Sequence, residues 1–191
     1  IDAESHVDVP HVAYTEKGAA RVKRLINGSW QSVGGNITSG NTSYTYLFAD
    51  GLGNLYLNYV DESSTGGKRL VVKKYNPITE SWEIPGGNAN NLYVSTGSIV
   101  QTIGSALTTA HNSWMAFDSQ NSPYVIFAET GSNSARPVVK KFDGTSWVTV
   151  GAGPVSTDAA TSVGIAFDNS GTTPYIVYEA GTGSTGTIKL Y

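Results

Sequence analysis

"KKFDGTSWVTVG" (residues 140–151) is one of three versions of the same phrase in this chain. The others are "KKYNPITESWEIPGG", which begins at residue 73, and "VKRLINGSWQSVGG", which begins at residue 22. Each version joins basic residues and an aromatic residue or leucine to a turn, and the turn leads to Ser-Trp and glycine. Asn, Asp and Gly in the turn tolerate the positive φ that a tight hairpin requires. The phrase therefore predicts a recurring pair of antiparallel strands.

A second, Tyr-rich segment also recurs along the chain. Its copies are "DVPHVAYTE" (8–16), "GNLYLNYVD" (53–61), "NSPYVIFAE" (121–129) and "TTPYIVYEA" (172–180). More continuously apolar segments precede three of them: "YTYLFAD" (44–50), "WMAFDS" (114–119) and "VGIAFD" (163–168). Alternating apolar residues that are rich in β-branched and aromatic types predict strands, so both kinds of segment are expected to be β-strands.

The order of these segments describes one repeated unit. An apolar strand, a Tyr-rich strand, a Lys-bearing strand and a Trp strand follow one another, and Lys23, Lys73, Lys140 and Lys189 recur at intervals of 50, 67 and 49 residues. A four-stranded antiparallel unit of about 45–50 residues is the sequence signature of a propeller blade. We therefore predict an all-β fold, a single β-propeller domain over 1–191 with repeats at approximately 1–43, 44–110, 111–161 and 162–191.

The second repeat carries an insert of about 18 residues near 86–109, which accounts for the longest interval. Three alternatives remain for it. A hairpin could follow the Trp82 strand, or "SIVQTIG" could be the true outer strand of the unit. A short helix over 98–108 is the third alternative, which the β-branched content disfavours.

The terminal repeats are incomplete in the sequence. The first lacks nearly all of its apolar strand and the last lacks its Trp strand, so we expect sheets of three, four, four and three strands. Exposed sheet edges invite pairing. The chain could be a segment of a longer repeat protein, a small four-bladed ring, or a subunit whose blades are completed by another chain; we favour the first.

Composition narrows the classes of function. Charged residues form 14% of the chain and the net charge is −3, which argues against nucleic-acid binding. The sequence has no cysteine, so disulfides and thiolate metal sites are ruled out. No stretch approaches the roughly 18 apolar residues of a membrane span. The three histidines are not at metal-ligand spacing, so we expect no metal and no cofactor; a Ca²⁺ site is an alternative that no motif supports.

Candidate ligand-binding residues are those that depart from the repeat or bring opposite charges together. An aromatic residue beside an arginine and a carboxylate could hold a sugar by stacking and charge-assisted hydrogen bonds. The structural alternative is that the tryptophan fills the core and the arginines pair with the acids. The candidates are Trp114, His111, Arg136, Arg69, Glu129 and Asp61.

Catalytic residues are harder to find. The acids that follow the Tyr-rich strand recur with the repeat, as scaffolding acids do, whereas a catalytic acid should break it. These recurring acids are Glu16, Asp61, Glu129 and Glu179. No recognised catalytic motif is present, so we predict no catalytic residue and a protein that is not an enzyme.

The "FDGTSW" stretch resembles the Asp-box turn of sialidase-type propellers, although here Asp and Gly adjoin. Over essentially its whole length the chain resembles, in repeat style, tandem-repeat β-propellers of secreted and cell-surface proteins, including propeller lectins. The resemblance implies an extracellular or cell-surface binding or adhesion module, with a glycan or a surface protein as its partner. One alternative is a structural subunit of a surface assembly that self-associates through its incomplete terminal blades. A second alternative is a propeller glycosidase or lyase.

Three Asn-x-Ser/Thr sequons begin at Asn27, Asn36 and Asn41. They are expected to be glycosylated if the source is a eukaryote that secretes the protein.

Overall fold

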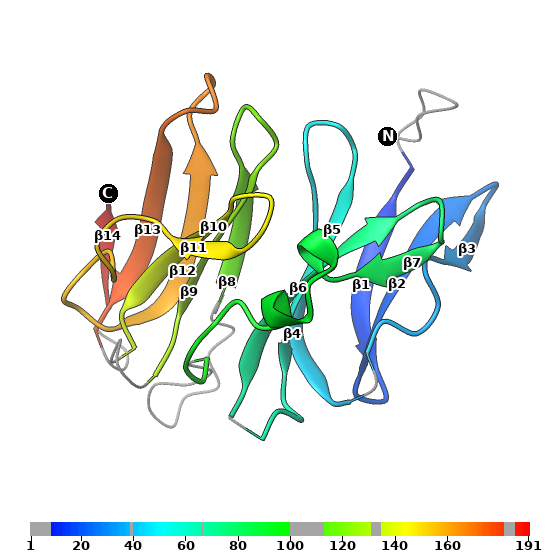
Figure 1. Cartoon of the computed structure of the whole chain (residues 1–191), viewed down its shortest axis with the longest axis horizontal. Helices are drawn as coiled ribbons and strands as arrows, with labels where there is room; N and C mark the ends of the chain where they lie inside the picture. The colour runs from blue at the N-terminus through cyan, green and yellow to red at the C-terminus, as the bar shows by residue number, and fades with distance from the viewer. Residues whose placement is uncertain (1–8, 39, 66, 100–112, 131–134, 182–185) are drawn as a thin grey trace.

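The structure is a computed structural model of the whole chain. It describes residues 9–38, 40–65, 67–99, 113–130, 135–181 and 186–191. The described residues form four antiparallel sheets of three, four, four and three strands, numbered I to IV along the chain. These strand numbers confirm the prediction from the repeats. The sheets follow one another across the molecule, from sheet I at the blue end of the chain to sheet IV at the red end (Figure 1).

The strands keep their chain order within every sheet. Sheet I consists of β1 (His11–Glu16), β2 (Ala19–Ile26) and β3 (Ser29–Ser32). Sheet II consists of β4 (Thr42–Ala49), β5 (Leu55–Asp61), β6 (Arg69–Asn76) and β7 (Ser81–Glu83). Sheet III consists of β8 (Ser113–Phe117), β9 (Pro123–Ala128), β10 (Pro137–Phe142) and β11 (Trp147–Thr149). Sheet IV consists of β12 (Ala160–Phe167), β13 (Pro174–Ala180) and β14 (Thr187–Leu190).

An aspartate at the end of the first strand explains why the first turn of sheets II, III and IV is so regular. Asp50 Oδ1 accepts two backbone N–H groups of its turn, each at 2.9 Å. Asp118 does the same at 2.9 Å, and Asp168 at 3.0 and 3.1 Å. Each turn also contains a residue at positive φ, and two of these are Gly53 and Asn121. The turn chemistry expected from the sequence is therefore present, and it fixes the register of the strands on either side.

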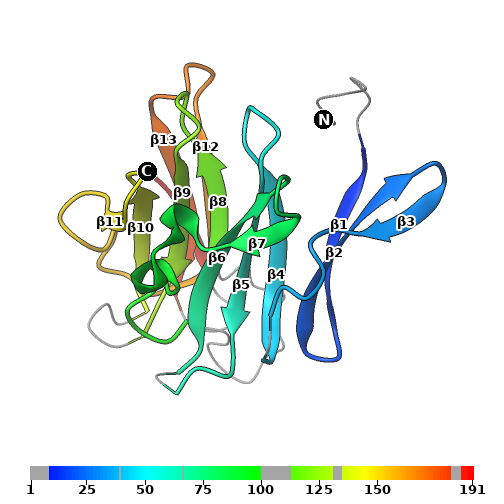
Figure 2. The same ribbon diagram turned by 45° about the vertical axis from the view of Figure 1, so that its right-hand side comes forward.

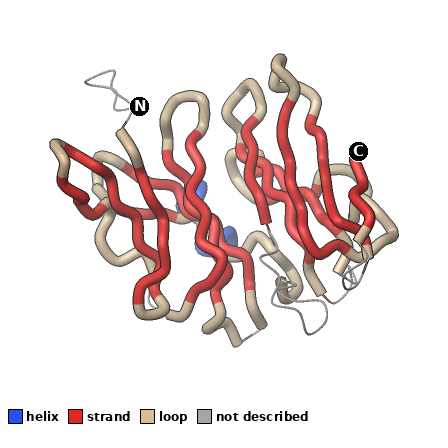
Figure 3. The backbone as a smooth tube through the Cα atoms, turned by 180° about the vertical axis from the view of Figure 1, so that it is seen from behind, coloured by secondary structure: helices blue, strands red, loops and turns tan. Residues whose placement is uncertain are grey.

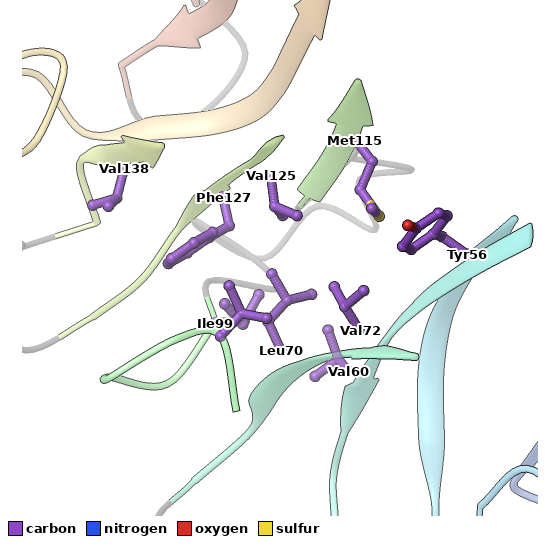
Figure 4. Packing of buried hydrophobic residues seen from close by; sticks show 10 residues of the cluster. Tyr56, Val60, Leu70, Val72, Ile99, Met115, Val125, Phe127 and Val138 are labelled. Carbon is purple, nitrogen blue, oxygen red and sulfur yellow. The ribbon is translucent and has the colours of Figure 1, made fainter. Parts of the chain in front are cut away.

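Neighbouring sheets pack face to face, and each interface has its own apolar core. The first strands of successive sheets are in contact, from β1 to β4, β8 and β12, and Figure 2 shows the same succession after a turn of 45°. The core between sheets II and III includes Leu70, Val72, Val125 and Phe127 (Figure 4). Burial of one such side chain contributes roughly 1.5–3 kcal/mol to folding. Seen from behind, β1 and β14 lie on opposite sides of the stack (Figure 3).

The long connection after sheet II agrees only in part with the alternative that placed a hairpin after the Trp82 strand. β7, which contains Trp82, pairs with β6 and is the outer strand of its sheet. Two 3-10 turns follow, η1 (Pro85–Gly87) and η2 (Ala89–Asn91). Tyr93 and Ile99 then make single bridges to sheets II and III. Most of the helix considered over 98–108 lies outside the described residues.

The recurring lysines do not hold one register throughout. Lys23, Lys73 and Lys140 pair with equivalent residues of the Tyr-rich strand, whereas Lys189 pairs with Tyr178, two residues further along that strand. A shift of two residues keeps the side chain on the same face. Counting lysine intervals therefore identified the correct strand and face but the wrong position in sheet IV.

Candidate functional site

A cavity of about 580 Å³ lies at β12, the first strand of sheet IV, beside β8, the first strand of sheet III. Its walls are mostly apolar and come from β8, β12, β13 and β14. The lining residues include Trp114, Ser162, Gly164, Val177, Glu179 and Ile188. A concave, largely apolar site with a few polar groups has the general character of a small-molecule pocket.

Trp114 forms the aromatic wall of this cavity. Its ring makes an edge contact with Phe48, with the ring centroids 5.2 Å apart, and a tilted contact with Tyr46 at 5.9 Å. Burial raises the pKa of the Tyr46 hydroxyl, and the neighbouring Tyr44 raises it further. The two rings from β4 therefore hold the indole from the side of sheet II, and one side of it lines the cavity.

The cavity exists because sheet IV lacks an aromatic residue where sheets II and III have one. Tyr46, Trp114 and Gly164 each lie four residues before the turn aspartate, and they pair with equivalent positions of the next strand. Gly164 has no side chain to fill the space that Tyr46 and Trp114 fill in their own sheets. A Cβ added there would come within 3.1 Å of Val177 Cγ1. Trp114 thus borders a space that an aromatic side chain at position 164 would fill.

Glu179 supplies the carboxylate among the described residues of the cavity wall. One of its oxygens accepts a hydrogen bond from Thr161 Oγ1 at 2.9 Å. A Cβ on Gly186 would collide with this carboxylate, so a glycine is required beside it. An aromatic surface and a half-buried carboxylate in the wall of one cavity can bind a sugar, the ring by stacking on its apolar face and the carboxylate by accepting from its hydroxyl groups.

The pairing register shows that Glu179 is not equivalent to the other recurring acids. Glu16, Asp61 and Glu129 occupy one position of the Tyr-rich strand, and the residue of sheet IV at that position is Ala180. Successive side chains of a strand point to opposite faces. A displacement by one residue therefore turns Glu179 away from sheet III and toward the cavity.

Asp61, Arg69 and Glu129 meet at a different place, the connection between sheets II and III. Arg69 donates from one nitrogen to the carbonyl oxygens of Ser95, at 3.0 Å, and Thr96. Tyr93 donates to Asp61 at 3.1 Å. These three predicted residues thus hold the connection instead of facing Trp114.

Glu129 is almost fully buried in this arrangement. Its carboxylate accepts the backbone N–H groups of Thr96 and Gly97, both at 2.8 Å, and the Thr96 hydroxyl at 2.9 Å. Arg136 is half-buried just before β10. His111 lies outside the described residues.

The acceptor asparagines of the three sequons, Asn27, Asn36 and Asn41, are exposed. Asn27 lies in the turn between β2 and β3, and the Asn36 side chain accepts from Arg21 at 2.5 Å. Their glycosylation stays a prediction. Within the described ranges, no three His, Cys, Asp or Glu side chains lie together as a metal site would require. No described helix has the length and apolar character to span a membrane.

The comparisons with known proteins match the fold and not the sequence. No protein-family model matches the chain, and no curated protein matches its sequence. An endo-arabinase from Bacteroides thetaiotaomicron is similar in structure, with a TM-score of 0.50 and 12% identity, over 93% of this chain and 72% of the arabinase. A Trypanosoma rangeli sialidase has a TM-score of 0.60 at 12% identity over 90% of this chain, and a PL25 ulvan lyase has 0.52 at 12% over 92%.

The chain spans 26% of that sialidase and 47% of that lyase. The similarity supports a propeller-like, all-β fold. It also corrects one expectation. The solved structures with this arrangement are mostly glycoside hydrolases or lyases, so the prediction that the protein is not an enzyme is wrong. That prediction rested on the lack of a recognised catalytic motif and on acids that recur with the repeat.

Proposed function

We propose that the chain is a glycan-processing module of the propeller type, which binds a sugar residue against Trp114 and uses Glu179 for proton transfer. The observation that carries the proposal is that two departures from the repeat meet in one cavity. Gly164 opens the space beside Trp114, and Glu179 is displaced by one residue into the same space. The structurally similar proteins, named as an arabinase, a sialidase and an ulvan lyase, support a glycan as the substrate class.

The chemistry open to this site depends on its carboxylates. Hydrolysis of a glycosidic bond commonly uses two carboxyl groups about 5–10 Å apart. Elimination needs a base that takes a proton from a sugar carbon; the bond from the adjacent carbon to the leaving oxygen breaks, a carbon–carbon double bond forms, and the leaving oxygen takes up a proton from the protonated base or from water. Among the described residues of the cavity wall, Glu179 is the group suited to either proton transfer.

The test is turnover of soluble polysaccharides of different chemistry: a neutral arabinan, a uronate-containing ulvan and a sialylated glycan. New reducing ends report bond cleavage, and the ultraviolet absorbance of an unsaturated product distinguishes elimination from hydrolysis. Glu179→Gln should lower turnover of the productive substrate by at least about 100-fold, the usual contribution of a general acid or base. Glu80→Gln, on an exposed turn, should leave it unchanged.

Two further variants separate binding from folding. Trp114→Ala should weaken binding, measured by isothermal titration calorimetry, while Gly164→Tyr gives sheet IV the side chain of sheet II and should fill the cavity. The melting temperature of each variant verifies that it folds. Binding without cleavage by the wild-type protein would overturn the catalytic proposal, and equal binding by Trp114→Ala would overturn the site.

A further inference from the structure

A second cavity, of about 390 Å³, lies at one end of sheet II and shares no lining residue with the cavity beside Trp114. Its lining comes from the residue before β5, from the paired ends of β6 and β7, and from η1. Sheet II packs on sheet I with one face and on sheet III with the other, so this cavity belongs to an internal sheet. The lining residues include Asn54, Lys74, Asn76, Glu83, Pro85 and Gly87.

Lys74, in the wall of this cavity, differs from its equivalent in sheet III. Lys74 pairs with Tyr56, and its ammonium lies 5.5 Å from the centroid of that ring. Lys141 pairs with Tyr124 in the same way, at 5.0 Å. Lys141 also forms an ion pair with Asp118 at 2.9 Å, whereas Lys74 forms none with a carboxylate of the described residues. The ammonium of Lys74 is therefore left to the cavity.

Asn54 explains why Lys74 has no such ion pair. Asp50 is the equivalent of Asp118, since both end the first strand and hold the turn that follows it. Asn54 Nδ2 donates to Asp50 Oδ2 at 2.7 Å. In sheet III the corresponding oxygen, Asp118 Oδ2, accepts from the lysine, and the residue at the position of Asn54 is Ser122. The amide of Asn54 thus replaces the lysine as the donor to the turn aspartate.

Glu83 is a second departure from the repeat in the same wall. It lies directly opposite Lys74 on β7, whereas the residue opposite Lys141 in sheet III is Val148. Glu83 Oε1 accepts from Asn76 Nδ2 at 2.9 Å, which holds the side chain against the turn between β6 and β7. Its Oε2 has no hydrogen-bond partner within the described ranges. Sheet II therefore presents a cationic donor and an anionic acceptor to one cavity.

The η1 wall of the cavity replaces a hydrogen bond of the repeat. In sheet I the Val33 carbonyl, three residues after the tryptophan of its strand, accepts from the Trp82 indole. Pro85 occupies that position in sheet II, but its carbonyl accepts from the buried Asn91 side chain at 3.1 Å. The Trp147 indole nitrogen has no partner in the part of the chain that the structure describes. Departures from the local rules of a fold concentrate at functional sites.

We propose that this cavity is a second glycan subsite, which binds one neutral sugar residue between Lys74 and Glu83. Sugar hydroxyl groups both donate and accept, so one can accept from the ammonium while another donates to the carboxylate. A carboxylate on the ligand would meet Glu83 and an ammonium would meet Lys74, so the pair favours a ligand without net charge. The choice of a glycan rests on the proposed function, whereas the site rests on this cavity and its departures from the repeat.

The experiment titrates the ¹⁵N-labelled protein with neutral oligosaccharides of arabinose, xylose and galactose and follows the backbone amide resonances of Gly86 and Gly87, which line the cavity. Trp114→Ala is titrated beside the wild type, because it removes the aromatic wall of the other cavity. At least one neutral oligosaccharide should shift both glycine resonances in both proteins. An oligosaccharide of galacturonate should bind there at least about 10-fold more weakly, because like charges are brought together.

Two substitutions test the residues that hold the sugar. Lys74→Met and Glu83→Val should each weaken this binding by at least about 10-fold, since each removes a charge-assisted hydrogen bond. Glu83→Val also gives sheet II the residue that sheet III has at this position. Lys17→Met is the matched control, because Lys17 is exposed on the turn between β1 and β2. The melting temperature of each variant verifies that it folds.

The outcomes separate this inference from the proposed function. If no neutral oligosaccharide shifts Gly86 and Gly87, or if their shifts disappear in Trp114→Ala, the second subsite is overturned whatever the turnover result. Shifts of both glycines without cleavage by the wild-type protein would support the subsite and overturn only the catalytic proposal. Equal binding by Lys74→Met and Glu83→Val, or tighter binding of the galacturonate oligosaccharide, would overturn the assignment of a neutral sugar to these two residues.

Discussion

Removal of the Glu129 carboxylate is expected to destabilise the fold more than removal of an exposed acid of the same repeat position. Glu129 is 1% exposed and accepts three hydrogen bonds that anchor the connection between sheets II and III. Glu129→Ala leaves two backbone N–H groups, those of Thr96 and Gly97, without this acceptor. Each buried group left unpaired costs about 1–3 kcal/mol, so we expect a loss of roughly 4 kcal/mol in the free energy of unfolding.

Glu129→Gln should cost less, about 2 kcal/mol, because the amide oxygen still accepts both N–H groups but without charge assistance. The amide NH₂ can donate to the Thr96 hydroxyl, so each of the three groups that now bond to Glu129 keeps a hydrogen-bond partner. The two variants together therefore measure the anchoring and its electrostatic part separately.

Glu16→Ala is the matched control for both variants. Glu16 occupies the equivalent position in sheet I, where its half-exposed side chain lies 3.8 Å from Arg21, and an exposed ion pair contributes 0–1 kcal/mol. The assay is urea unfolding followed by circular dichroism, together with hydrogen exchange of the Gly97 amide. A loss below about 1 kcal/mol for Glu129→Ala, or unchanged protection of Gly97, would refute the anchoring role.

Three further predictions concern the same scaffold. Burial disfavours ionisation of Asp118, but the Lys141 ammonium and the turn N–H groups outweigh it and hold the pKa of Asp118 below its ordinary value. Stability from this group is therefore present above the unfolded pKa of about 3.9 and lost as the pH falls below it; urea unfolding between pH 7 and pH 3 should show a smaller loss for Asp118→Asn. Gly97→Ala should cost about 2 kcal/mol in thermal unfolding, since its Cβ would collide with the Thr130 carbonyl oxygen, an overpacked contact; an unchanged melting temperature would contradict this. Trp82→Phe should cost at least about 1 kcal/mol through loss of its indole hydrogen bond, and chemical denaturation that shows no change would mean that the bond contributes nothing.

Much of the fold could be predicted because its determinants are local. A strand of period two and a turn aspartate such as Asp50 or Asp118 act within a few residues, and both recur in the sequence. The number of strands in each sheet follows from that pattern alone. The connection after sheet II could not be predicted in the same way, because its short 3-10 turns and single bridges depend on contacts with two sheets at once.

The candidate site was predicted in part, for a related reason. Trp114 was selected as a departure from the repeat, whereas the pairing register makes it equivalent to the aromatic Tyr46; the structure nevertheless places Trp114 in the cavity wall. Asp61, Arg69 and Glu129 were grouped with it by charge, yet they hold the connection between two sheets. Opposite charges that are close in a repeat predict that the residues interact. They do not show whether the residues form a ligand site or hold a connection between sheets.

The sequence analysis missed the roles of Glu179 and Gly164. Its copies of the repeat were not aligned residue by residue, so it could not tell which residues differ from their equivalents. In a strand, a displacement by one position moves a side chain to the opposite face, whereas a displacement by two does not. Lys189 is displaced by two and stays on its face, so its misalignment had no consequence. Glu179 is displaced by one, and this difference separates a scaffolding acid from one that faces a cavity. Gly164, aligned from the turn aspartate, is the departure that leaves the space beside Trp114 open. Both residues belong to sheet IV. The two departures from the repeat that line the cavity thus lie in one sheet.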